Sequence, residues 1–260
     1  MTKQEFASRL QNACAAVTAA EQELTEIDSR FGDADHGLTM SKIAKAISAA
    51  AGESEGGIQS MLDDAATAVM ALNGGSAVPL WNTWLDGLQE EAPEGNEIDT
   101  AGIQAIFAKA LKALSDMSGA KVGDKTMMDA LIPASQAIAA YSGSDEAGLF
   151  DAAAQAALQG AEASKQFVSK FGRAKSYGEQ TIGTPDGLFL PGAGTALSAS
   201  PLILNGRYSI YENEEVYQLP RDHHRRGAGG SWPGLPRHSG GGRPSSHQQG
   251  PGRRRPGDHR

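Results

Sequence analysis

The chain has 260 residues, of which 40% are apolar and 6% aromatic, and its alanine-rich stretches favour close-packed helices over sheets. Its single cysteine, Cys14, excludes an internal disulfide and is typical of a reducing compartment, so we expect a cytoplasmic protein. No segment approaches the roughly twenty apolar residues of a membrane span, and the N-terminus lacks the pattern of a secretory signal.

The net charge of −8 is unevenly distributed. Residues 221–260 contain nine Arg, no Lys and two Asp, a local charge of +7, so residues 1–220 carry −15 (−8 minus 7). An acidic body repels phosphate backbones and is not expected to bind nucleic acid. We expect the Arg/Gly/Pro-rich tail, residues 206–260, to be disordered. A basic tail that binds nucleic acid or an acidic partner is the alternative.

Apolar residues recur at helical spacing in seven segments before residue 180, and no alternating strand pattern of useful length occurs there. Short loops join the segments, so neighbouring helices should be antiparallel. The sequence therefore predicts an all-α bundle over residues 1–205. The expected helical segments are 6–27, a run that starts after Gly37, 58–72, 79–88, 100–117, 126–141 and 147–171.

Four of the connecting loops are rich in glycine and carry chargeable side chains. Loops at one end of a helical bundle are a natural place for a binding site. We therefore expect the site to be assembled from residues 28–37, 74–78, 119–125 and 172–186.

The first of these loops contains three carboxylates within eight residues, Asp28, Asp33 and Asp35. Anions this close together repel one another unless a cation compensates. Mg²⁺ prefers carboxylate, phosphate and water oxygens, and three aspartates suit a pair of Mg²⁺ ions on a polyphosphate. The alternative is a solvated acidic turn whose aspartates cap helices.

The remaining loops carry weaker signals. Residues 36–39 lie where a helix is predicted to begin, and the free N–H groups of a helix N-terminus suit a phosphate. Residues 74–76 are small enough for backbone to approach a bound group, although a helix C-cap explains them equally well. Residues 123–126 are also compatible with a simple helix cap. Arg173 suits bidentate phosphate contact, but a single loop arginine is usually solvated.

Taken together, these loops resemble the L subunit of dihydroxyacetone kinase. Residues 32–38 (GDADHGL) are similar to the metal loop of that family. Residues 123–129 (GDKTMMD) match its second signature, and residues 172–183 (GRAKSYGEQTIG) match its third. The order and spacing of the motifs agree over residues 5–186.

The resemblance implies an antiparallel eight-helix barrel with a nucleotide, ADP or ATP, bound at one end. It also implies that Asp28, Asp33 and Asp35 coordinate two Mg²⁺ ions that bridge the phosphates. It assigns no catalytic side chain to this chain. The implied nucleotide-contacting positions are His36, Gly37, Leu38, Thr39, Ser76, Ala77, Gly119, Met127, Arg173 and Asp186.

The family transfers a phosphoryl group from the Mg-bound nucleotide to a short-chain ketose such as dihydroxyacetone. The ketose is captured on a histidine of a separate K subunit or domain, and we expect no such domain in this chain. The resemblance therefore implies an enzyme subunit that acts with a partner K subunit. In some members a phosphocarrier protein of the phosphotransferase system rephosphorylates bound ADP, and in others ATP exchanges. We also expect a homo-oligomer.

Two alternatives remain open at this point. The first is a binding module that signals its nucleotide state to a regulator, and the second is a degenerate family member; both compete with the enzyme subunit. The second alternative rests on departures from the family pattern. Val78 stands where the family has glycine, and four residues separate Asp186 from Pro191 where the family has Asp-Pro-Gly-Ala. After Ala193 the expected apolar helix is interrupted by proline and glycine.

Overall fold

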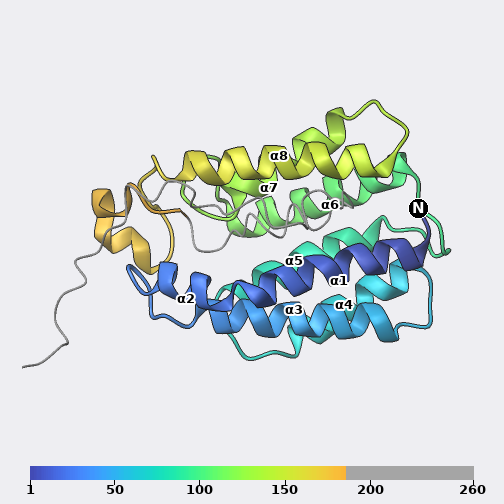
Figure 1. The fold of residues 1–260 in the computed structure, drawn as a ribbon, viewed down its shortest axis with the longest axis horizontal. Helices are drawn as coiled ribbons and strands as arrows, with labels where there is room; N and C mark the ends of the chain where they lie inside the picture. The colour runs from blue at the N-terminus through green and yellow to red at the C-terminus, as the bar shows by residue number, and fades with distance from the viewer. Residues whose placement is uncertain (186–260) are drawn as a thin grey trace, which may run out of the picture. The chain divides into compact units, whose positions relative to one another are not determined.

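The computed structural model describes residues 1–185, which form eight α-helices and one 3₁₀ helix without a strand (Figure 1). The predicted all-α class is confirmed, whereas Asp186 and the predicted tail at 206–260 lie outside the described residues. The helices are α1 (Lys3–Ala19), α2 (Glu21–Asp28), α3 (His36–Glu53), α4 (Ile58–Met70), α5 (Ala77–Glu90), α6 (Thr100–Ser118), α7 (Met128–Ala140), α8 (Glu146–Ser164) and the 3₁₀ helix η1 (Arg173–Thr181).

The long helices form an antiparallel row that curves into a barrel. In chain order α1 packs on α3, and each helix from α3 to α8 packs on the next, while α2 lies against α3. The two ends of the row meet, because the Arg9 guanidinium of α1 lies 5.5 Å from the ring centre of Phe150 on α8. Cys14 and Val17 of α1 also belong to the same core cluster as Phe150. The described helices therefore enclose one shared core.

Side-chain caps fix several of the helix ends. Thr2 and Glu5 form a capping box at the start of α1. Asp99 and Asp145 accept hydrogen bonds from backbone N–H groups in the first turns of α6 and α8. Gly119 ends α6 with a φ of 65°, a conformation that glycine adopts without strain. These caps fix where α1, α6 and α8 begin and where α6 ends.

Helices α4 and α6 contribute fully buried side chains to the core. Ile58, Met61 and Leu62 of α4 are fully buried, as are Ile103 and Ile106 of α6. Burial of such side chains contributes roughly 1.5–3 kcal/mol each to folding before the opposing entropy is subtracted. The named core residues belong to the helices, so the loops at the barrel ends are free to form a binding site.

The structure corrects two predicted helices. The continuous helix expected over residues 6–27 is divided at Ala20, where ψ is 12°. The helix expected to reach Phe171 ends at Ser164, where the next N–H groups bond three residues back, and the Lys125 ammonium donates to the carbonyls of Ser164 and Phe167. Part of the loop expected at 172–186 is the 3₁₀ helix η1.

Within residues 1–185, none of the helices combines the length and the apolar character that a membrane crossing requires.

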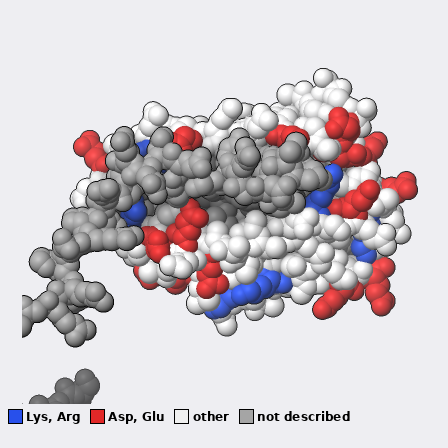
Figure 2. Space-filling model, viewed as in Figure 1, with Lys and Arg blue, Asp and Glu red and all other residues white. Residues whose placement is uncertain are grey.

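The antiparallel order brings the glycine-rich loops together. The connections α2–α3, α4–α5, α6–α7 and the segment after α8 all lie at one end of the barrel, on the left in Figure 1. This end is called the loop end below. Figure 2 shows acidic side chains gathered at the opposite, right-hand end.

Candidate metal centre and adjoining cavity

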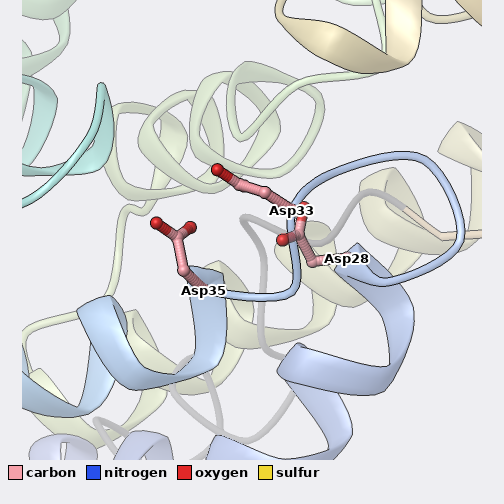
Figure 3. Close-up of side chains that lie close together, drawn as sticks. All are labelled: Asp28, Asp33 and Asp35. Carbon is pink, nitrogen blue, oxygen red and sulfur yellow. The ribbon is translucent and has the colours of Figure 1, made fainter.

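The three predicted metal ligands converge at the loop end. Asp28 is the last residue of α2, Asp33 lies in the following loop, and Asp35 immediately precedes α3. One carboxylate oxygen from each lies within 4.8 Å of the others. Figure 3 shows the three carboxylates around a common space. The chain therefore brings together three oxygen ligands from a short segment.

The backbone of the loop is shaped for this convergence. The Gly32 N–H donates to the Asp28 carbonyl at 2.6 Å. A Cβ on Gly32 would collide with the Asp28 carboxylate, so only glycine leaves that side chain in place. Ala34 has a φ of 60°, a left-handed conformation that costs an alanine about 1–2 kcal/mol. Strain of this kind is found where the chain must present particular groups.

Helix capping does not explain the aspartates. Asp35 occupies the N-cap position of α3, yet its side chain makes no capping hydrogen bond. Asp28 ends a helix, where the helix dipole disfavours a negative charge. Its Oδ2 atom is buried and has no hydrogen-bond partner among the described residues. A buried carboxylate oxygen without a donor is costly, and a cation supplies what is missing.

A second segment contacts the acidic loop from across the site. The Arg173 guanidinium, at the start of η1, forms an ion pair with Asp33 at 2.6 Å. The Phe31 and Tyr177 rings meet edge to face, with centres 5.2 Å apart. Both contacts connect η1 to the loop between α2 and α3.

The acidic loop borders a cavity of about 570 Å³, a size typical of small-molecule sites. Apolar side chains from α5 and α6, among them Leu80, Leu114 and Met117, form part of its wall. The aspartates and Arg173 supply charged groups to the same cavity. The predicted site residues that line it are Asp28, Asp33, Asp35, His36, Thr39, Ser76, Ala77, Met127 and Arg173.

Three predicted site residues lie outside the lining. Gly37 is buried against α2, where a Cβ would collide with the Glu21 carbonyl oxygen and the Thr25 hydroxyl. The Leu38 side chain is 48% exposed. Gly119 ends α6 between two lining residues. The geometry thus gives Gly37 and Gly119 clear roles in the fold, and any contact of these three with a ligand stays a prediction.

Val78 does not disturb the cavity. It lies in the first turn of α5, is 7% exposed and belongs to the core cluster. Gly75 and Ser76, just before it, do line the cavity. The departure from the family pattern at this position therefore points into the core.

Sequence reasoning did not assign a role to Lys125 or Asp129, although both belong to the second motif. The Asp129 carboxylate is buried and accepts hydrogen bonds from the N–H groups of Gly123 (2.6 Å) and Thr126 (2.8 Å). Lys125 is 6% exposed, lines the cavity and has a φ of 57°. The left-handed φ of Lys125 is a property of the backbone, so no signal in the sequence marked this constrained loop.

The described fold and site define an all-α barrel with a three-aspartate centre beside a cavity at its loop end. The model of the DAK2 domain family matches residues 30–198, and the chain belongs to this family.

Two relatives illustrate the range of the match. The chain is 37% identical over 176 residues to a D-erythrulose kinase of Mycolicibacterium smegmatis, a match that covers 66% of this chain and 30% of that protein. It is 26% identical over 185 residues to the ADP-binding subunit DhaL of a PEP-dependent dihydroxyacetone kinase of Listeria innocua, covering 70% of this chain and 86% of that subunit. The chain thus spans about 30% of the erythrulose kinases and most of the separate subunit.

Among solved structures, the native dihydroxyacetone kinase of C. freundii superposes with a TM-score of 0.56 at 23% identity. The match covers 74% of this chain and 34% of that protein. At this identity the likeness concerns the fold, and it agrees with the predicted helical barrel.

Proposed function

We propose that this chain is the nucleotide-binding component of a kinase that phosphorylates a short-chain ketose. The observation that carries the proposal is the three-aspartate centre beside a cavity, with the buried Oδ2 of Asp28 lacking a donor. Family membership supports it, as does the match along most of a subunit described as ADP-binding. A complex of the C. freundii kinase contains AMP-PNP and Mg²⁺, and that protein has the same fold at 22% identity.

The aspartates fit Mg²⁺ by chemistry and by spacing. Oxygen ligands of one Mg²⁺ lie at about 2.0–2.1 Å from the ion, hence no more than about 4.2 Å from each other. The carboxylate oxygens here lie within 4.8 Å of one another, so a small adjustment or the sharing of two ions accommodates them. When bound, Mg²⁺ would neutralise charge on the transferring phosphates.

The other lining residues divide into two groups in this proposal. The first turn of α3 holds backbone N–H groups that have no acceptor within the helix, and these suit phosphate oxygens. Arg173 supplies a guanidinium that matches phosphate geometry. The apolar wall with Leu80, Leu114 and Met117 suits the base of a nucleotide.

The ketose is expected to come from a partner, either a K-type subunit or a further domain. All exposed large apolar side chains of residues 1–185 belong to helix ends and loops at the loop end, and Met117 and Phe171 among them also line the cavity. Exposed apolar surface marks a place where another protein docks. A docked partner would present its ketose at the nucleotide phosphates. These side chains are Leu38, Met70, Met117, Val122, Phe171, Tyr177 and Ile182.

The test is calorimetric titration of the purified chain with ADP and with ATP, each with and without Mg²⁺. We expect binding that requires Mg²⁺, and at least a tenfold loss of affinity in Asp35→Asn, because a metal ligand is removed. Asp64→Asn, an exposed site on α4, is the matched control and should bind normally. Wild-type protein that binds neither nucleotide would refute the proposal.

The phosphoryl donor is identified by a separate measurement. The protein is purified gently and denatured, and any released nucleotide is separated by chromatography. Retained ADP would indicate rephosphorylation by a phosphocarrier protein. An empty protein that takes up Mg-ATP would indicate free exchange.

A further inference from the structure

Residues 168–183 form a loop whose two ends lie side by side; it is called the Arg173 loop below. The Ser169 N–H donates to the Thr181 hydroxyl at 3.0 Å. Just outside this pair, the Gly183 N–H donates to the Lys165 carbonyl at 2.7 Å. Inside the loop Gly172 has a φ of 59° and Gly178 a φ of 53°. The loop is thus a closed excursion from the end of α8, with tight turns within it.

A buried lysine fastens both ends of the loop at once. The Lys125 ammonium donates to the carbonyls of Ser164 (2.9 Å) and Phe167 (3.3 Å), on the approach to the loop. It also donates to the Thr184 carbonyl at 2.6 Å, on the exit. An ammonium group has three N–H donors, so these acceptors can use all of them.

The backbone conformation and the burial of Lys125 support its role in holding the loop. Its backbone holds a left-handed φ of 57°, a strained conformation for a residue with a long side chain. The side chain is 6% exposed, and burial of a charge is costly unless polar groups compensate it. The carbonyls at the end of α8 provide that compensation, because the C-terminus of a helix is its negative end.

The backbone of the loop in turn determines where the Arg173 side chain lies. The Arg173 side chain is 68% exposed, so packing alone does not hold it, and its described ion pair with Asp33 joins two exposed groups. Such surface pairs are weak and do not by themselves fix a side chain. The backbone of the loop therefore sets the direction in which the guanidinium reaches the cavity.

We propose that Lys125 is a positioning residue: by fastening both ends of the Arg173 loop, it presents Arg173 to the phosphates of the bound nucleotide. This inference rests on the proposed function for the nucleotide but adds a residue that acts without touching it. A lysine that served only to stabilise the barrel would leave the contribution of Arg173 unchanged.

A double-mutant cycle in Mg-ADP affinity separates the two roles. In the native background, Arg173→Gln should weaken binding about tenfold or more, because it removes a charge-assisted hydrogen bond. In the Lys125→Met background the same change should cost less than about twofold, since a released loop no longer places the guanidinium. Lys121→Met, an exposed lysine in the same motif loop, should leave the tenfold effect intact.

Hydrogen exchange provides a readout that does not depend on the nucleotide. The N–H groups of Lys170 and Gly183, bonded to the Asp124 and Lys165 carbonyls at the loop base, should exchange faster in Lys125→Met. The exchange rates of the α4 N–H groups should not change. Fast exchange throughout the chain would show that Lys125→Met unfolds the barrel. The cycle is then repeated with Thr181→Val, which removes the hydroxyl that joins the two ends.

Additive losses in the cycle, or unchanged exchange at Lys170 and Gly183, would overturn the positioning role. A wild-type chain that binds no Mg-ADP would instead refute the proposed function, while the exchange experiment would still test whether Lys125 anchors the loop.

Discussion

Replacement of Gly37 by alanine tests whether the packing of α2 on α3 sets the spacing of the aspartates. A Cβ at this position would lie 2.8 Å from the Thr25 nitrogen and still closer to the Glu21 carbonyl oxygen. Ordinary contact begins near 3.4 Å, so α2 must recede by at least 0.6 Å (3.4 minus 2.8). Both neighbours are parts of α2, which carries Asp28 at its end. The carboxylate of Asp28 must therefore move relative to Asp35.

The expected cost has two parts. Overpacking costs typically about 1–3 kcal/mol, and a clash with backbone belongs at the upper end. Alanine recovers about 1 kcal/mol relative to glycine within a helix. The net loss is about 2 kcal/mol, which lowers the melting temperature of a chain of this size by about 4–8 °C. Metal sites tolerate only about 0.5 Å of displacement, so Mg²⁺ affinity should fall at least tenfold.

Thermal unfolding and Mg²⁺ titration calorimetry measure the two effects. Gly95→Ala is the matched control, because a Cβ there would meet nothing within 4 Å. It should change neither the melting temperature nor the metal affinity. If Gly37→Ala were as stable as the wild type and bound Mg²⁺ equally well, the spacing of the aspartates would not depend on the contact between α2 and α3.

Three further changes probe groups around the site and within the core. The Lys170 ammonium lowers the pKa of Asp124. Their interaction therefore stabilises the fold above about pH 4 and is lost as the pH falls through the folded-state pKa of Asp124. Asp124→Asn should remove this part of the acid sensitivity, measured by thermal unfolding at several pH values. Burial raises the pKa of Cys14 to about 12, so its thiol should react with a disulfide reagent only when the chain unfolds. Gln104→Leu should cost about 1–3 kcal/mol in chemical denaturation, because the carbonyls of Ile138 and Tyr141 lose the side-chain amide that donates to both.

The helices and the acidic centre could be predicted from the sequence, because each depends on residues that are close together along the chain. The spacing of apolar residues within one segment is enough to predict a helix. The predicted ranges 58–72 and 100–117 agree closely with α4 and α6. The aspartates lie within eight positions of one another, so the chain cannot carry them far apart. Local patterns of this kind are legible in one sequence.

The fastening of the Arg173 loop could not be read in the same way. Lys125 reaches carbonyls 39 and 59 positions further along the chain, and a backbone carbonyl leaves no trace in the residue letters. Gly37 illustrates the opposite difficulty. It stands inside the metal motif, yet the structure buries it against α2, because the direction of a residue depends on helix phase.

The two sides of the site also require different amounts of the chain to be in place. The aspartates come from one turn between two adjacent helices, so a hairpin of α2 and α3 already contains all three. Arg173 and Met127 reach the cavity only after segments roughly a hundred or more positions apart have met, and contacts of such range form late in folding. On the proposed function, a nascent or partly opened chain would capture the metal ion before it can retain a nucleotide, and nucleotide retention would report that the barrel has closed.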